Sequence, residues 1–250
     1  MTDHRLSSAL FSSDGMMAIF SAKDTVQCML DVEAALARAL AQEGVIPAQS
    51  VTAIANACRA DQIDIQLLAH DARQSGNLAI PLVKQLTAKV AAVDAQAARH
   101  VHWGATSQDI IDTGLVLQLC QAIDLITSEL AELADALAAH AHRHRATPMI
   151  GRTWMQHALP ITFGLKAAGW LDAILRHQDV RKNVSVLQFG GAAGSLASLG
   201  DKGLAVSQAL ANELQLTLPA IPWHTHRDRI AEVGTALGLL TGTLGKIARD

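Results

Sequence analysis

The sequence contains no tyrosine, and aromatic residues make up only 3% of its 250 residues. Strands favour aromatic and β-branched side chains, whereas helices favour alanine and leucine, so this composition argues against an all-β fold. Charged residues are also few, at 17%, and the net charge is −3 at pH 7. Because binding to a phosphate backbone requires a basic face, we expect no nucleic-acid partner.

Cysteine is also scarce, since only Cys28, Cys58 and Cys120 occur, far apart in apolar stretches. An odd number of widely spaced cysteines predicts buried thiols in a reducing compartment, rather than a disulfide framework or a metal knuckle. The N-terminal residues lack the basic start and apolar core of a secretion signal. The uncharged stretch Asn183 to Gly200 holds too many Gly, Ser, Asn and Gln residues to lie in lipid, so we expect a cytoplasmic protein without a membrane span.

Half of the residues are apolar, and their spacing predicts helices. The first helix is expected from Lys23 to Gln42, ending before Gly44. Three further stretches carry apolar seams at steps of three and four residues: Leu119, Ile123, Ile126, Leu130, Leu133 and Leu137; Gly164, Ala168, Leu171 and Leu175; and Ile230, Val233, Leu237, Leu240, Leu244 and Ile247. Long amphipathic helices need long neighbours, so the sequence predicts an all-α fold, with a small helical N-terminal domain (residues 1–110) and an elongated helical bundle (residues 111–250).

Three other patterns in the sequence each allow a simple interpretation. The last seam is still in phase at Asp250, without a glycine cap or a proline, so we expect either a piece of a longer protein or a last helix that finishes abruptly. The stretch Gly190 to Gly203 lacks the Lys-Ser/Thr ending of a phosphate-binding loop, which favours a plain connection between helices. His140 and His144 share a helix face and could bind a metal, but they also continue the long seam beside arginines. A structural or solvated role is therefore expected for them, and no metal site is predicted.

Three polar clusters interrupt the apolar pattern, at Gln74–Asn77, His102–Asp109 and Gly151–His157. Each cluster is rich in hydrogen-bond donors. In the second cluster, Thr106 or Ser107 is placed to cap the long helix. Hydroxyls and backbone N–H groups at the start of a helix can also bind an anion, and the two roles are compatible.

Two of these clusters carry a family resemblance. His102 to Ile110 (HWGATSQDI) resembles the first signature of the fumarase/aspartase superfamily, in its adenylosuccinate lyase-like branch. Gly151 to Pro160 (GRTWMQHALP) resembles the next signature of that superfamily. Within it, the segments Leu10 to Phe20, Gly76 to Pro81 and Pro222 to Thr225 are most similar to the branch of 3-carboxy-cis,cis-muconate cycloisomerases.

The resemblance implies a three-domain, all-helical subunit whose long helices form the core of a homotetramer with shared active sites. It also implies a cofactor-independent isomerase that lactonises a tricarboxylate, 3-carboxy-cis,cis-muconate, to 4-carboxymuconolactone in the protocatechuate (β-ketoadipate) pathway. The third signature of the superfamily, a mobile loop whose serine is implied as the base at carbon, would lie beyond Asp250. The chain as written is therefore expected to bind tricarboxylates weakly and to turn over none.

In the second signature, Trp154 stands where most relatives have a histidine. In the lyases, that histidine is taken to assist a leaving group, such as an amine whose conjugate acid has a pKa of about 10. The carboxylate that leaves in the reverse cycloisomerase reaction has a pKa of about 4 and needs no acid. Trp154 therefore favours lactone chemistry over an amine lyase, although a tryptophan buried in the core is the alternative interpretation.

The matching segments supply the candidate site residues. The resemblance and the donor chemistry assign catalytic roles to His102, Ser107, Trp154 and His157, and substrate binding to Ser75, Asn77, Thr106 and Arg227. The donors among these residues would bind carboxylates and stabilise enolate-like charge, while His157 would orient the substrate or relay a proton. Two alternatives stay open: another lyase of the superfamily, such as an adenylosuccinate lyase-like enzyme, and a catalytically incomplete helical fragment that only oligomerises.

Overall fold

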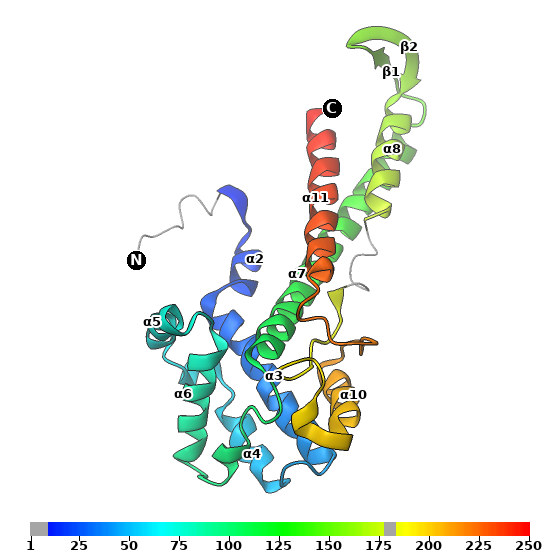
Figure 1. Cartoon of the computed structure of the whole chain (residues 1–250). Helices are drawn as coiled ribbons and strands as arrows, with labels where there is room; N and C mark the ends of the chain where they lie inside the picture. The colour runs from blue at the N-terminus through cyan, green and yellow to red at the C-terminus, as the bar shows by residue number, and fades with distance from the viewer. Residues whose placement is uncertain (1–9, 178–183) are drawn as a thin grey trace. The chain divides into compact units, whose positions relative to one another are not determined.

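The computed structural model describes residues 10–177 and 184–250 (Figure 1). Asn183, the first residue of the uncharged stretch, lies outside these ranges. The chain divides into two compact units, Met1–Ala122 with Ser185–Arg227 and Ile123–Val184 with Asp228–Asp250. The division thus falls within a long helix, and residues 185–227 return to the first unit. The domain boundary predicted at residue 110 stays a prediction.

The first unit is built from helices. They are α2 (Asp14–Ile19), α3 (Ala22–Gln42), α4 (Gln49–Ala57), α5 (Ile65–Ser75), α6 (Ala79–Ala91), α10 (Gly203–Leu214) and the first part of α7 (Ser107–Arg143), with the 3₁₀ turns η1 (Ala60–Gln62), η2 (Ala97–His100) and η3 (Ala197–Lys202). The predicted first helix is confirmed as α3. Its start is capped by the Ser21 hydroxyl, which accepts a hydrogen bond from the Asp24 N–H at 3.1 Å.

Helix α3 forms the centre of the first unit, because it packs against α4 and α10. Leu30, Leu36 and Leu40 of this helix are fully buried. Burial of a leucine side chain contributes about 1.5–3 kcal/mol. Helix α7 also passes close to α3, since a Cβ at Gly114 would lie 2.9 Å from Met29 Cγ. The glycine is therefore required for this close approach.

The second unit contains the rest of α7, the strands β1 (Pro148–Thr153) and β2 (Gln156–Thr162), and the helices α8 (Phe163–Leu175) and α11 (Asp228–Arg249). Its core joins the long helices through Leu130, Ala134, Leu137, Ile174 and Leu240. Three of these residues belong to the predicted seams, so the prediction of long helices that pack along apolar seams is confirmed. The all-α fold is confirmed as well, with one hairpin as an exception.

That hairpin, β1 and β2, was not predicted from the sequence. The strands pair antiparallel, with Thr153 opposite Gln156, so the tip consists of Trp154 and Met155. Both tip residues have positive φ, at +50° and +62°. Two-residue hairpin turns with positive φ normally carry Asn or Gly, and bulky residues give no such signal. Gly151 allows the strands to meet, because a Cβ there would lie 2.6 Å from the Leu159 carbonyl oxygen.

The three cysteines are buried and unbridged, as predicted. Burial, the largest effect, and the nearby Asp24 and Asp31 charges raise the pKa of Cys28 to about 12. Burial also raises the pKa of the Cys58 thiol. A thiol with a raised pKa carries little of the reactive thiolate at neutral pH, so a structural role fits these two residues.

Helix α7 is, among the described helices, the one that is long and apolar enough to cross a membrane. Half of its most apolar window is buried inside the structure. A core helix meets the same criteria of length and composition, so this match is weak evidence for a membrane span.

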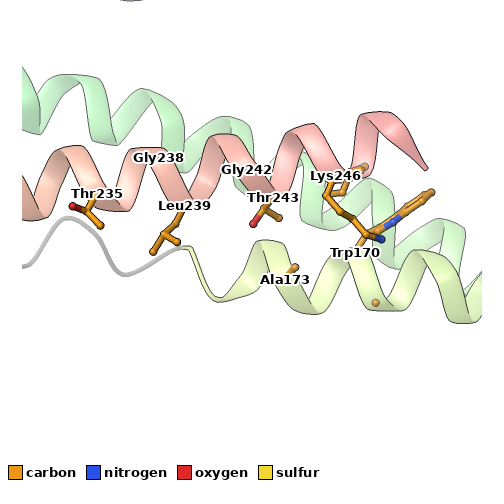
Figure 2. Close-up of a pocket in the computed structure, with 10 residues that line it drawn as sticks. Trp170, Ala173, Thr235, Gly238, Leu239, Gly242, Thr243 and Lys246 are labelled. Carbon is orange, nitrogen blue, oxygen red and sulfur yellow. The ribbon is translucent and has the colours of Figure 1, made fainter. Parts of the chain in front are cut away.

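Helices α8 and α11 border a cleft of about 680 Å³ in the second unit (Figure 2). Its lining is mostly apolar or small and includes Gly169, Ala173, Gly238, Leu239 and Gly242. At one end the Lys246 ammonium lies 6.0 Å from the centre of the Trp170 ring. The cleft is therefore mostly apolar, and the Lys246 ammonium at one end is paired with the Asp250 carboxylate.

Candidate functional site

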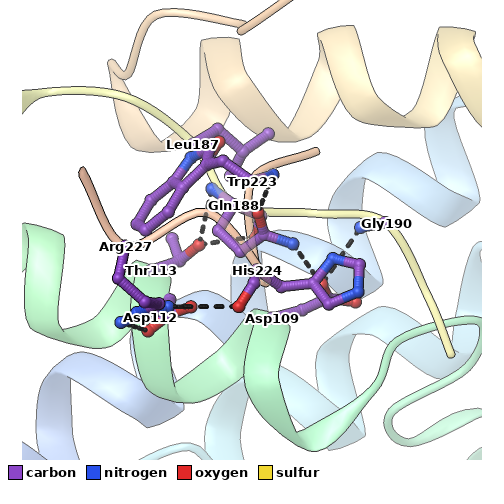
Figure 3. A network of polar contacts seen from close by, with 9 residues as sticks. All are labelled: Asp109, Asp112, Thr113, Leu187, Gln188, Gly190, Trp223, His224 and Arg227. Carbon is purple, nitrogen blue, oxygen red and sulfur yellow. Dashed lines mark hydrogen bonds and ion pairs between the residues drawn. The ribbon is translucent and has the colours of Figure 1, made fainter. Parts of the chain in front are cut away.

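The start of α7 is fixed by a buried carboxylate, Asp109, which is 1% exposed. One of its oxygens accepts hydrogen bonds from Gln188 Nε2 at 2.9 Å and Gly190 N at 3.0 Å. The other accepts from Thr106 N at 3.0 Å and Gly191 N at 2.9 Å. Figure 3 shows the two contacts with Gln188 and Gly190. Burial raises the pKa of Asp109, whereas these donors oppose that rise. The carboxylate thus ties the glycine-rich segment to the helix start.

The same segment is held by Gln188, whose side-chain oxygen accepts from Trp223 N at 2.6 Å. Its backbone carbonyl accepts from the Thr113 hydroxyl at 2.7 Å, and the Trp223 indole donates to the Leu187 carbonyl at 2.9 Å (Figure 3). This stretch lies outside any helix or named strand, so side chains satisfy buried backbone groups that regular structure would otherwise satisfy.

Arg227 lies beside this network and forms a two-pronged ion pair with Asp112. Its Nη1 and Nη2 atoms lie 2.7 Å and 2.9 Å from the two Asp112 oxygens (Figure 3). Asp112 is 1% exposed, and the guanidinium lies 5.7 Å from the centre of the Trp223 ring. The contacts with Asp112 raise the pKa of Arg227. The predicted substrate-binding arginine is therefore held in place by a buried carboxylate, with part of its donor set already engaged.

His102 is paired with Glu33 of α3, a residue that was not predicted from the sequence to belong to the site. The His102 Nδ1 atom lies 2.5 Å from the Glu33 Oε1 atom, and the glutamate side chain is fully buried. Burial by itself would lower the pKa of His102, but the hydrogen bond and charge of Glu33, together with the charge of Asp109, raise it. The available signal was an acidic residue inside the long apolar run of α3.

Thr106 and Ser107 lie at the N-terminus of α7, as predicted. Ser107 is the first helical residue, and the Thr106 N–H donates to the Asp109 carboxylate as in a capping box. The half-buried Ser107 hydroxyl has no hydrogen-bond partner among the described residues. It is therefore available as a donor at the positive end of the long helix.

Ser75 and Asn77 serve the corner between α5 and α6. The Ser75 hydroxyl lies within hydrogen-bond distance of the Asp71 and Asn77 carbonyl oxygens, at 3.2 Å and 2.9 Å. The Asn77 side-chain oxygen accepts from Ile80 N at 3.0 Å. Both residues thus have local structural roles, and substrate binding by them stays a prediction.

Trp154 and His157 belong to the second unit. Trp154 is 94% exposed at the hairpin tip, so the interpretation of this residue as a core tryptophan is wrong. His157 lies exposed on β2, opposite Arg152 of β1. Their predicted catalytic roles are not tested by the structure of one chain.

The described part of the chain contains no group of three or more His, Cys, Asp or Glu residues that could hold a metal ion. His140 and His144 stack with ring centres 5.9 Å apart, and the edge of Phe163 meets the second ring at 5.2 Å. These contacts are consistent with the structural role expected for the histidines.

The first unit therefore places an imidazole, two hydroxyl residues and the positive end of a long helix in one short segment. Such groups bind carboxylates and stabilise negative charge that develops on a substrate. The chain belongs to the lyase family, whose pattern it matches over residues 10–250.

Within that family, the chain is 56% identical over 245 residues to a 3-carboxy-cis,cis-muconate cycloisomerase of Bradyrhizobium diazoefficiens, covering 96% of this chain and 54% of the relative. It is 53% identical to the Pseudomonas aeruginosa protein of the same name, over 99% of this chain and 55% of the relative. The crystal structure of the Pseudomonas putida lactonizing enzyme superimposes with a TM-score of 0.95 at 52% identity, covering 98% of this chain and 57% of that one. The chain thus spans about half the length of the curated relatives it matches.

Proposed function

We propose that this chain is the N-terminal part of a cofactor-independent cycloisomerase that converts 3-carboxy-cis,cis-muconate to 4-carboxymuconolactone. The observation that carries the proposal is the identity of more than half of the residues with cycloisomerases, over nearly the whole chain. We place the reaction in the protocatechuate (β-ketoadipate) pathway.

The reaction is an isomerisation in which no atom is lost. One carboxylate oxygen of the substrate forms a C–O bond to a carbon of the conjugated diene, and the adjacent carbon gains a proton. The substrate carries three carboxylates, so it requires several donors. The segment from His102 to Ser107 supplies an imidazole, hydroxyls and backbone N–H groups at the start of α7. These residues bind a carboxylate and stabilise the enolate-like charge that forms as the proton moves.

The Trp154 side chain supports a lactonising rather than an amine-releasing reaction. An indole N–H is a hydrogen-bond donor only and does not deliver a proton at neutral pH. A carboxylate leaving group, with a pKa of about 4, departs without an acid. The exposed position of Trp154 at the hairpin tip leaves its ring accessible to a substrate or a neighbouring subunit.

We propose further that the protein is a cytoplasmic homotetramer with active sites shared between subunits. Large apolar side chains are exposed on the two helices of the second unit that border the cleft: Leu165 and Leu175 on α8, and Leu239 and Leu244 on α11. Apolar residues grouped in this way are typical of surfaces that other chains cover. Sedimentation at micromolar concentration that shows only a folded monomer would contradict this part of the proposal.

The decisive experiment follows the ultraviolet absorbance of the substrate diene with the complete gene product. We expect absorbance to fall as the lactone forms, without release of fumarate from succinyl adducts assayed in parallel. Release of fumarate without loss of the diene would identify another lyase of the superfamily. Activity in neither assay, with a folded oligomer present, would contradict the proposed reaction and favour a protein that only oligomerises.

A further inference from the structure

Glu33 is an acidic residue of α3, a helix with many buried residues. Its side chain is fully buried, and the adjacent residues Val32 and Ala34 are buried too. Burial of a carboxylate is costly unless a partner compensates its charge. The Oε1 atom has His102 Nδ1 at 2.5 Å, whereas the buried Oε2 atom has no hydrogen-bond partner among the described residues. Among the described residues, His102 is therefore the hydrogen-bonding partner of this buried carboxylate.

His102 is held in an unusual backbone conformation, with φ at +58°. A residue other than glycine rarely adopts this conformation, and such residues are concentrated at functional sites. The side chain is 19% exposed. Its Nε2 atom makes no hydrogen bond to the described residues. One edge of the ring thus faces Glu33 and the other remains accessible.

The protonation state of this ring decides what its accessible edge can do. With Glu33 accepting at Nδ1, a neutral imidazole carries its hydrogen on Nδ1 and presents a lone pair at Nε2. That lone pair would repel a substrate carboxylate. An imidazolium instead presents an Nε2–H donor. Burial alone would favour the neutral form, whereas the adjacent Glu33 carboxylate favours the imidazolium through its hydrogen bond and its charge.

We infer that Glu33 is a positioning residue that keeps His102 protonated and directs its Nε2–H toward a carboxylate of the substrate. The inference rests on the proposed function, in which His102 binds substrate. Glu33 itself does not touch the substrate, because its carboxylate is buried behind the imidazole. The pair accounts for the presence of an acidic side chain in the core of α3.

The test uses the complete gene product and measures binding of propane-1,2,3-tricarboxylate, a saturated tricarboxylate, by calorimetry from pH 6 to pH 9. For the wild type, we expect affinity to persist above the ordinary histidine range and then to fall as His102 loses its proton. Glu33→Gln preserves the shape of the side chain but removes the charge, so the fall should move to lower pH. At pH 8 the variant should bind about tenfold more weakly or worse, as expected for the loss of a charge-assisted hydrogen bond.

The matched control is Ser50→Ala, because the buried Ser50 hydroxyl contacts Nδ1 of the nearby His100 at 3.1 Å. This variant also removes the partner of a histidine, but it should leave the pH profile unchanged. A double variant then shows whether Glu33 acts through His102. In a His102→Gln background the profile should lose its fall, and Glu33→Gln should add no further loss of affinity.

Several results would overturn the inference. For Glu33→Gln, these results are a pH profile of affinity like that of the wild type, or a loss of affinity that is the same at every pH. For the double variant, the result is a loss of affinity equal to the sum of the losses in the two single variants. For the wild type, the results are an affinity that rises with pH, or no binding at any pH. If Glu33→Gln does not fold, the pH profile of affinity in His102→Gln tests the inference instead. A fall in affinity with pH that persists in this variant would exclude His102 as the titrating donor. The diene assay stays separate. A shifted binding profile without diene turnover would refute the proposed reaction and leave the role of Glu33 standing.

Discussion

Replacement of Asp109 by asparagine is expected to destabilise the first unit strongly. Both carboxylate oxygens are engaged, since one accepts from Gln188 Nε2 and Gly190 N and the other from Thr106 N and Gly191 N. An asparagine keeps one oxygen and replaces the other with an NH₂ group. Whichever way the amide turns, two N–H donors lose their acceptor and face another N–H group.

The magnitude follows from the cost of buried donors without an acceptor, which is about 1–3 kcal/mol each. Two such donors predict a loss of about 2–6 kcal/mol in the free energy of unfolding. Burial of the Asp109 carboxylate is unfavourable for its charge and raises its pKa. Asparagine removes this charge, which offsets part of the loss in the free energy of unfolding. Because domains are typically stable by about 5–15 kcal/mol, the variant should be visibly destabilised or unfolded.

Urea denaturation followed by far-ultraviolet circular dichroism measures the loss. Asp94→Asn is the matched control, because within the described part of the chain only one Asp94 oxygen accepts hydrogen bonds, from Gln96 N at 2.9 Å and Ala97 N at 3.0 Å. An asparagine can present its oxygen to both groups there, so the control should be close to wild type. A loss below about 1 kcal/mol for Asp109→Asn, or equal losses for the two variants, would refute the argument from paired acceptors.

Three further predictions concern the proposed site. Ser107→Ala should lower turnover in the diene assay by about 10²–10³-fold with little change in the free energy of unfolding. Ser21→Ala, which removes a helix cap, should lower the free energy of unfolding by about 1 kcal/mol in a urea titration and leave turnover unchanged. If the two variants had the same effects on turnover and on stability, a donor role for Ser107 would be contradicted. Burial by itself would lower the pKa of His102, but Glu33 raises this pKa above 6.5. The pair therefore contributes stability that is fully present below pH 6.5 and is lost as the pH rises through the pKa of His102 in the folded state. Urea titrations should show this fall in the wild type and not in Glu33→Gln. Trp154→Phe should retain lactonisation, and a loss beyond about 10²-fold would indicate that the indole assists the leaving group.

Apolar spacing determined much of the helical architecture. The run around Leu30, Leu36 and Leu40 and the seams through Leu130 and Leu240 predicted α3, α7 and α11, because a helix that buries one face repeats its apolar residues every three or four positions. The donor cluster at the start of α7 was also predictable, since cap residues lie next to the helix they begin. Local chemistry of this kind is written in consecutive residues.

Tertiary structure decided the contacts between residues far apart in the chain. Glu33 meets His102, and Asp112 meets Arg227, only because folding brings α3, the start of α7 and the segment before α11 together. No spacing rule connects such positions. The hairpin was missed for a different reason, since Trp154 adopts a positive φ that its side chain disfavours and that the surrounding strands impose. The sequence thus determined where donors cluster, whereas the fold determined which of them are charged, which are already paired and which remain available to a substrate.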